Sequence, residues 1–128
     1  MKNRWMDRCL YESPYHLTLC TTEKQFRREL KTLDLSKSDW PNFTVNDHSH
    51  AACHWFSSRF GQICIVCIRP NRKRTIHQIN ALIVHECVHL WQAIKEHIGE
   101  REPSKEFEAY AIQSLVQGLM LEYERQTK

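Results

Sequence analysis

The chain has 128 residues, of which 41% are hydrophobic and 26% charged, with 3 glycines and 4 prolines. This balance is typical of one folded domain over residues 1–128 and excludes disordered, collagen-like and low-complexity chains. The formal net charge of +3 is too small to require a nucleic-acid partner by itself.

No run approaches the roughly 18 consecutive apolar residues that a membrane span needs, and the first residues lack the apolar stretch of a signal peptide. We therefore expect a soluble, cytoplasmic protein without a membrane partner. In that compartment the cysteines are expected to be reduced thiols rather than disulfides. They are Cys9, Cys20, Cys53, Cys64, Cys67 and Cys87.

Residues 16–20, HLTLC, alternate in a way that predicts a short strand. Thr22, with Gln25 three residues later, has the spacing of a capping box and predicts the start of a helix. Apolar residues then recur at helical spacing until the sequence SKSDWPN interrupts them. They are Phe26, Leu30 and Leu33.

Two strand-like runs, AACHWFSS at 51–58 and QICIVCIR at 62–69, are separated by three turn residues and predict a hairpin. The second run is apolar on both faces, which is typical of a strand covered by helices on both sides.

Thr75 with Gln78 repeats the capping-box spacing and predicts a helix from Ile76 to Ile98, which Gly99 ends. Ser104 is expected to cap a last helix over 105–124. The order of elements predicts an α+β domain with a small antiparallel or mixed sheet and two neighbouring C-terminal helices.

The central helix contains the pattern HExxH, as His85, Glu86 and His89. Histidines four residues apart project from one face of a helix and are close enough to hold one zinc ion. Glu86 lies about 100° around the helix from His85, where it is beside the metal site.

A helical projection predicts the core face of this helix and leaves both histidines looking away from it, toward a polar arc with Gln78, Ala81, Gln92 and Glu96. We interpret this arc as one wall of a cleft. The alternative is an amphipathic helix with two half-exposed histidines and a solvated Glu86. The residues predicted for the core are Ile76, Ile83, Val84, Cys87, Val88, Trp91, Ile94 and Ile98.

A catalytic zinc normally has three protein ligands, so a third must come from elsewhere in the chain. Glu108 is the candidate, because Ala111, Ile112 and Leu115 follow it on one apolar helix face, where a carboxylate needs a cation. A Lys or Arg across the core is the alternative partner for Glu108. Glu106 lies on a polar face, and the helix dipole accounts for it.

These residues resemble the gluzincin metallopeptidases, whose zinc is held by HExxH and a glutamate on a following helix. The likeness covers roughly residues 62–120, and EFEAYAIQ is similar to a stretch of small phage-encoded metallopeptidases. The resemblance implies a minimal zincin-like domain, in the host cytoplasm if phage-encoded. It also implies zinc on His85, His89 and Glu108, with Glu86 as the general base.

The family also implies that the strand at 62–68 pairs with an extended substrate. The chain departs from the thermolysin-like pattern at Ile112, where those proteins have an aspartate that orients a zinc histidine. The residue that stabilises the oxyanion stays open among several candidates. They are Tyr11, Tyr15, His77, Tyr110 and Tyr123.

Two further patterns have a plain and a functional interpretation. Cys64 and Cys67 are favoured as buried core thiols, since a strand sends them to opposite faces; the alternative is a second zinc site with Cys53, His54, His48 or His50. The basic run of Arg69, Arg72, Lys73 and Arg74, expected at the mouth of the cleft, is either a solvated loop or a contact for nucleic acid or an acidic partner.

The sequence thus favours a zinc metallopeptidase that acts on peptide or protein substrates. The alternative is a phage-type interaction or inhibitor protein that keeps a zinc site for structure, without turnover. The oligomeric state stays open.

Overall fold

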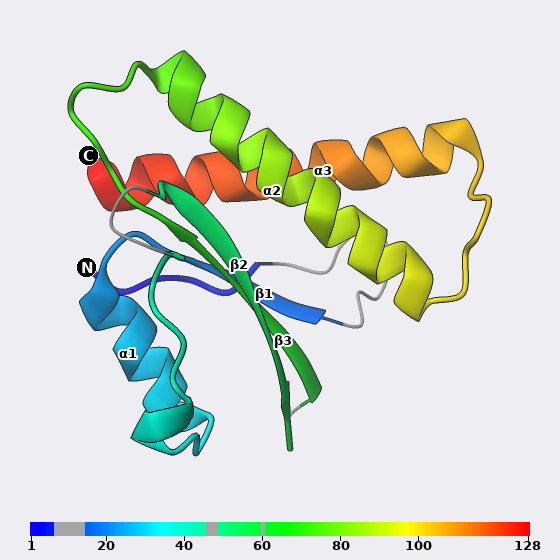
Figure 1. The fold of residues 1–128 in the computed structure, drawn as a ribbon. Coiled ribbons are helices and arrows are strands. Elements are labelled where there is room, and N and C mark those ends of the chain that lie inside the picture. Colours follow the sequence, from blue (N-terminus) through cyan, green and yellow to red (C-terminus); the bar gives the residue numbers. More distant parts are fainter. Residues whose placement is uncertain (7–14, 46–48, 60) are drawn as a thin grey trace.

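The computed structural model describes residues 1–6, 15–45, 49–59 and 61–128. Within these ranges the chain forms a small α+β domain with a three-stranded mixed sheet, as predicted (Figure 1). Its elements are β1 (Tyr15–Cys20), α1 (Glu23–Thr32), the 3-10 helix η1 (Lys37–Asp39), β2 (Ala51–Ser58), β3 (Gly61–Ile68), α2 (Ile76–His97) and α3 (Lys105–Thr127).

The strands lie in the order β1-β3-β2, so β3 is central. It runs parallel to β1, with Tyr15 opposite Gln62, and antiparallel to β2, with Ser58 opposite Gly61. The predicted hairpin is confirmed. The expectation that 62–68 pairs with a substrate is wrong, because neighbouring strands already occupy both edges of β3.

The side chains of β3 alternate between two hydrophobic layers. Cys64, Val66 and Ile68 pack in the larger cluster with α2 and α3, whereas Ile65 and Cys67 pack with α1. Figure 1 shows the same arrangement, with α2 and α3 on one face of the sheet and α1 on the other. This explains why β3 is apolar on both faces, and it confirms Cys64 and Cys67 as buried thiols on opposite sides.

Local signals set the helix ends. Thr22 and Thr75 both form the predicted capping boxes, and the side chain of Ser104 accepts from the amide of Phe107. Gly99, with φ of +77°, follows the last residues of α2 in the left-handed conformation that favours glycine.

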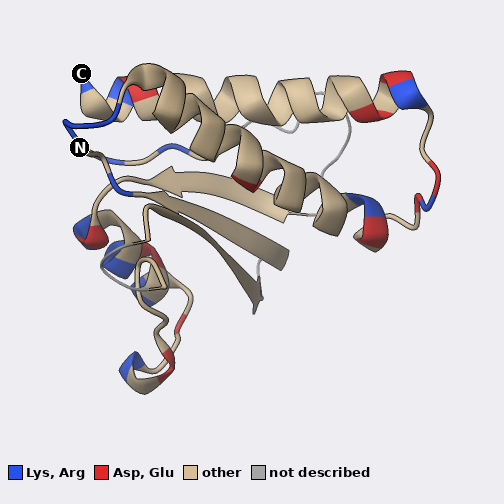
Figure 2. Cartoon of the chain, turned by 45° about the horizontal axis from the view of Figure 1, so that its top comes forward, with Lys and Arg blue, Asp and Glu red and all other residues tan. Residues whose placement is uncertain are grey.

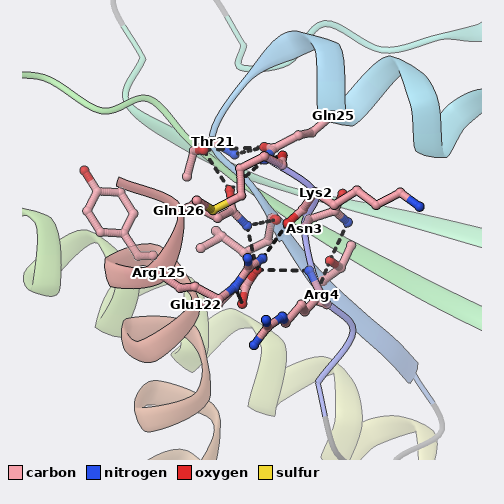
Figure 3. Close-up of polar contacts among 12 residues, drawn as sticks. Lys2, Asn3, Arg4, Thr21, Gln25, Glu122, Arg125 and Gln126 are labelled. Carbon is pink, nitrogen blue, oxygen red and sulfur yellow. Dashed lines mark hydrogen bonds and ion pairs between the residues drawn. The ribbon is translucent and has the colours of Figure 1, made fainter. Parts of the chain in front are cut away.

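A buried carboxylate fixes the end of α3 against the N-terminal segment (Figure 3). Glu122 is 5% exposed and accepts hydrogen bonds from the amide of Arg4 at 3.0 Å and from Arg125 Nε at 2.9 Å. Gln126 links the same helix to the backbone of Leu19 on β1. These bonds hold α3 over β1, so that α2 comes to lie over β2.

Charged residues are sparse along α2 and α3. Before Lys95, α2 carries one charged residue, Glu86, and α3 carries none between Glu108 and Glu122. Figure 2 shows the corresponding uncharged middle of α3, and on α2 one acidic band before the charged residues at its C-terminal end. Among the described residues, no helix is both long and apolar enough to span a bilayer.

Candidate metal and substrate site

The face of α2 that is buried in the structure is rotated about the helix axis relative to the face that the sequence predicts. Ile83, Cys87, Trp91 and Ile94 are buried as expected, but Val84 is 41% and Val88 37% exposed. Ile76 and Ile98, also predicted for the core, are exposed, whereas Ile79, Glu86 and Leu90 are buried. The reason is that β2 and α3 cover α2 from two sides, so the core side follows these contacts rather than the hydrophobic arc of the isolated helix.

His85 and His89 converge on one point, as their spacing predicts. Their Nε2 atoms lie 3.2 Å apart, and both side chains are exposed. Two imidazole nitrogens on a tetrahedral zinc, each about 2.0–2.1 Å from the metal, are separated by about 3.3–3.4 Å. The observed distance is therefore close to that of two ligands of one ion. It also fits a nitrogen–nitrogen hydrogen bond between the two rings when no metal is bound.

Gln92 contacts the other ring nitrogen of His89. Its Oε1 lies 3.3 Å from Nδ1 of His89. A proton on Nδ1 that is donated to this oxygen leaves Nε2 with a free lone pair on the side of His85. Gln92, one turn along the same helix face, is thus placed to orient the ring of His89.

Glu86 is buried beside the exposed histidines. It is 8% exposed, and its Oε2 accepts a hydrogen bond from the thiol of Cys53 on β2, with the sulfur 2.9 Å away. A hydrogen bond to Cys64, burial and the charge of Glu86 all raise the pKa of Cys53, so the thiol stays protonated and donates. No described residue supplies a hydrogen bond to Oε1 of Glu86.

These groups line one cavity of about 530 Å³ between α2 and β2. The helix contributes His85, Glu86 and His89, and the strand contributes its residues on the helix side. Among the described residues no strand pairs with the outer edge of β2, so this wall of the cavity is also an open strand edge. The remaining lining residues are Val45, Ala51, Ala52, Cys53, Trp55, Gln92, Ala93 and Glu96.

The structure does not bring Glu108 to the histidine pair. Its Oε2 accepts from Trp91 Nε1 at 2.8 Å and lies 3.7 Å from Nζ of Lys95. Trp91 projects about 160° around α2 from His89, so Glu108 packs against the opposite side of the helix. This is the alternative that the sequence left open, in which a lysine across the interface partners the carboxylate.

The other described candidates do not line the cavity. His54 contacts the carbonyl of Phe43 through Nε2, Glu106 is exposed, and His48 and Tyr11 lie outside the described residues. Of the remaining oxyanion candidates none lines the cavity; Tyr15 packs against Trp55, which does. The described part of the chain contains no group of three or more His, Cys, Asp or Glu side chains placed to hold a metal.

None of the four residues of the basic run lines the cavity, so the run does not form its mouth as expected. Arg69 donates through Nε to Thr44 at 3.0 Å, lies 3.6 Å from Glu23 and covers the ring of Phe43. Arg69 therefore has a structural role, while Arg72 and Lys73 are exposed.

Sequence reasoning missed two groups of the cavity. Cys53 was assigned only to a possible second zinc site, and the alternation of β2 gave no sign that its thiol faces Glu86. Trp55, two residues along the same strand face, was not singled out, although a strand period of two places it with Cys53.

Comparison with models of protein families, with curated proteins and with solved structures finds no significant match.

Proposed function

We propose that this chain is a zinc-dependent metallopeptidase with a minimal zincin-like domain, in which His85 and His89 bind the metal and Glu86 is the general base. The observation that carries the proposal is the 3.2 Å separation of the two Nε2 atoms beside a buried carboxylate in one cavity. The helix spacing brings the two rings together, and the buried carboxylate beside them supplies the base that this chemistry requires.

The residues of the cavity provide part of the ligand set of a zinc ion. The imidazole pair supplies two nitrogen ligands, and zinc, when bound, supplies Lewis acidity toward a peptide carbonyl. A third protein ligand has to reach the cavity. Glu108, which the gluzincin pattern implies, does so only if its side chain gives up Trp91 and Lys95.

Glu86 is suited to hold and move a proton. The thiol of Cys53 fixes Oε2, which leaves Oε1 for a water or a substrate amine. Burial between α2 and β2 keeps this carboxylate in one position, and a fixed position is what proton transfer requires.

The open edge of β2 is suited to hold an extended peptide. No described strand pairs with this edge, which leaves it open to antiparallel or parallel pairing, and the side of the strand that faces α2 lines the cavity. β2 therefore replaces 62–68 as the strand proposed to pair with the substrate.

The placement of Glu108 favours a second candidate. With two described ligands at the pair, the same cavity suits a zinc-binding interaction or inhibitor protein that has no turnover. In that case the cavity and the edge of β2 bind a partner peptide and release it intact.

The test is Glu86→Gln, which keeps the shape and an acceptor for Cys53 but removes the base. The zinc-loaded parent is expected to cleave a peptide library, with cleavage abolished by chelation. Glu86→Gln should retain zinc in elemental analysis and lose cleavage by at least about 100-fold. Equal peptide binding by parent and variant with no cleavage by either would favour the interaction protein.

A further inference from the structure

The cavity extends well beyond the imidazole pair. Along α2 it runs from His85 to Glu96, which is about 16 Å of helix. Its far end has no role in the chemistry proposed above. The residues there are Trp55 from β2 and Glu96 from α2.

Aromatic contacts place Trp55 at the end of the cavity near the last turn of α2. The ring of Tyr15 packs edge-on against Trp55, with centroids 5.0 Å apart, and against His97, with centroids 5.5 Å apart. Tyr15 therefore joins Trp55 to the residue that follows Glu96. The indole keeps 39% of its surface exposed and available to a ligand.

Glu96 brings an uncompensated negative charge to this end. Its carboxylate has no hydrogen bond or ion pair with any residue that the structure describes. The neighbouring Lys95 turns to the other side of α2, where it pairs with Glu108. A carboxylate that lines the same end of a cavity as an exposed indole is a combination that attracts an organic cation.

We propose that Trp55 and Glu96 form a subsite for a basic side chain, arginine in preference to lysine, of a peptide held along β2. This inference rests on the proposed function. A guanidinium can stack its flat face on an indole while the N–H groups in its own plane pair with a carboxylate. An ammonium acts as a point charge and cannot do both in this way. Glu96 lies about 10 Å along the helix from His89, so the basic side chain belongs to a residue close to the bond at the imidazole pair.

The experiment measures peptide binding without turnover. Fluorescein-labelled peptides that differ only in one arginine, replaced by citrulline or by glutamate, are titrated into the Glu86→Gln protein, with anisotropy as the readout. The arginine peptide is expected to bind about tenfold more tightly than the citrulline peptide. Equal binding of the two peptides would overturn the proposal.

Variants of the far end locate the subsite. Glu96→Gln and Trp55→Leu should each reduce the preference for arginine to about threefold or less, and Glu96→Lys should reverse it toward the glutamate peptide. Glu100→Gln is the matched control, because Glu100 is exposed beyond α2 and does not line the cavity. If the preference survives Glu96→Lys, the proposal is wrong.

The subsite and the peptidase activity can be overturned independently of each other. Selective binding of the arginine peptide with no cleavage by the zinc-loaded parent supports the subsite and overturns the peptidase. Cleavage by the parent that is indifferent to arginine, citrulline and glutamate supports the peptidase and overturns the subsite.

Discussion

The thiol of Cys53 on β2 donates a hydrogen bond to the carboxylate of Glu86 on α2, over 2.9 Å. It joins the open strand edge to the carboxylate proposed as general base. Because Glu86 is 8% exposed, loss of this donor removes a partner from a nearly buried charge.

We expect Cys53→Ala to lower the free energy of unfolding by about 1–3 kcal/mol, since the carboxylate stays buried without its donor. Cys53→Ser keeps a donor and should lose less. Urea unfolding of the three proteins measures the difference. Cys67→Ala is the control for lost packing, because Cys67 is fully buried on the other face of the sheet. Equal losses for Ala and Ser at position 53 would show that the hydrogen bond contributes nothing.

The first turn of α2 allows a test of the scaffold that carries the histidines. Thr75 accepts from the amide of Gln78, and the side chain of Gln78 accepts from the amide of Thr75. Thr75→Ala should cost about 0.5–2 kcal/mol in unfolding free energy, and Thr75→Ser should recover most of it. Because the histidines lie more than two turns away, zinc binding by the folded Thr75→Ala protein should be unchanged.

The elements of this fold are readable from the sequence because their signals are local. Capping residues at Thr22 and Thr75, glycine after α2 and alternation in the strands each depend on neighbours a few residues away. The convergence of His85 and His89 is local for the same reason, since four residues of helix determine it.

The packing of helices and strands against one another cannot be predicted from such local signals. The direction in which α2 is turned depends on β2 and α3, so Val84 is exposed and Glu86 is buried, against the helical projection. The sequence predicts Glu108 on the apolar face of its helix, but its side chain is 39% exposed, and the donor and cation that it meets depend on how α3 lies against α2. The central place of β3 follows from the pairing with β1, which lies about 45 residues earlier in the chain.

Glu122 provides a prediction on pH. Burial raises its pKa, but hydrogen bonds from Arg125, Gln126 and the amide of Arg4 outweigh burial, so the folded-state pKa lies below the ordinary 4.5. A lowered pKa gives stability that is present above about pH 4.5 and is lost as the pH falls through the folded-state value.

We therefore expect Glu122→Gln to lower the unfolding free energy by about 1–3 kcal/mol at pH 7. The gap between parent and variant should narrow as the pH falls below 4.5. Urea unfolding at several pH values measures this gap. Glu124→Gln is the control, because Glu124 is exposed and pairs with Lys128 at the surface, so it should change little. A gap for Glu122→Gln that is constant with pH would contradict the assignment.

Substitution of Glu108 distinguishes a role as zinc ligand from a structural role. In this structure it accepts from Trp91 and faces Lys95, so we expect Glu108→Ala to leave the zinc affinity within about twofold of the parent, while His85→Ala lowers it by at least about 10-fold. Titration of the apoprotein with zinc, followed by calorimetry, measures both. Trp91→Phe completes the test, because it removes the indole donor and should cost about 1–3 kcal/mol of unfolding free energy with no change in zinc affinity. A loss of zinc in Glu108→Ala as large as that in His85→Ala would show that the carboxylate leaves Trp91 to bind the metal, as the gluzincin pattern implies.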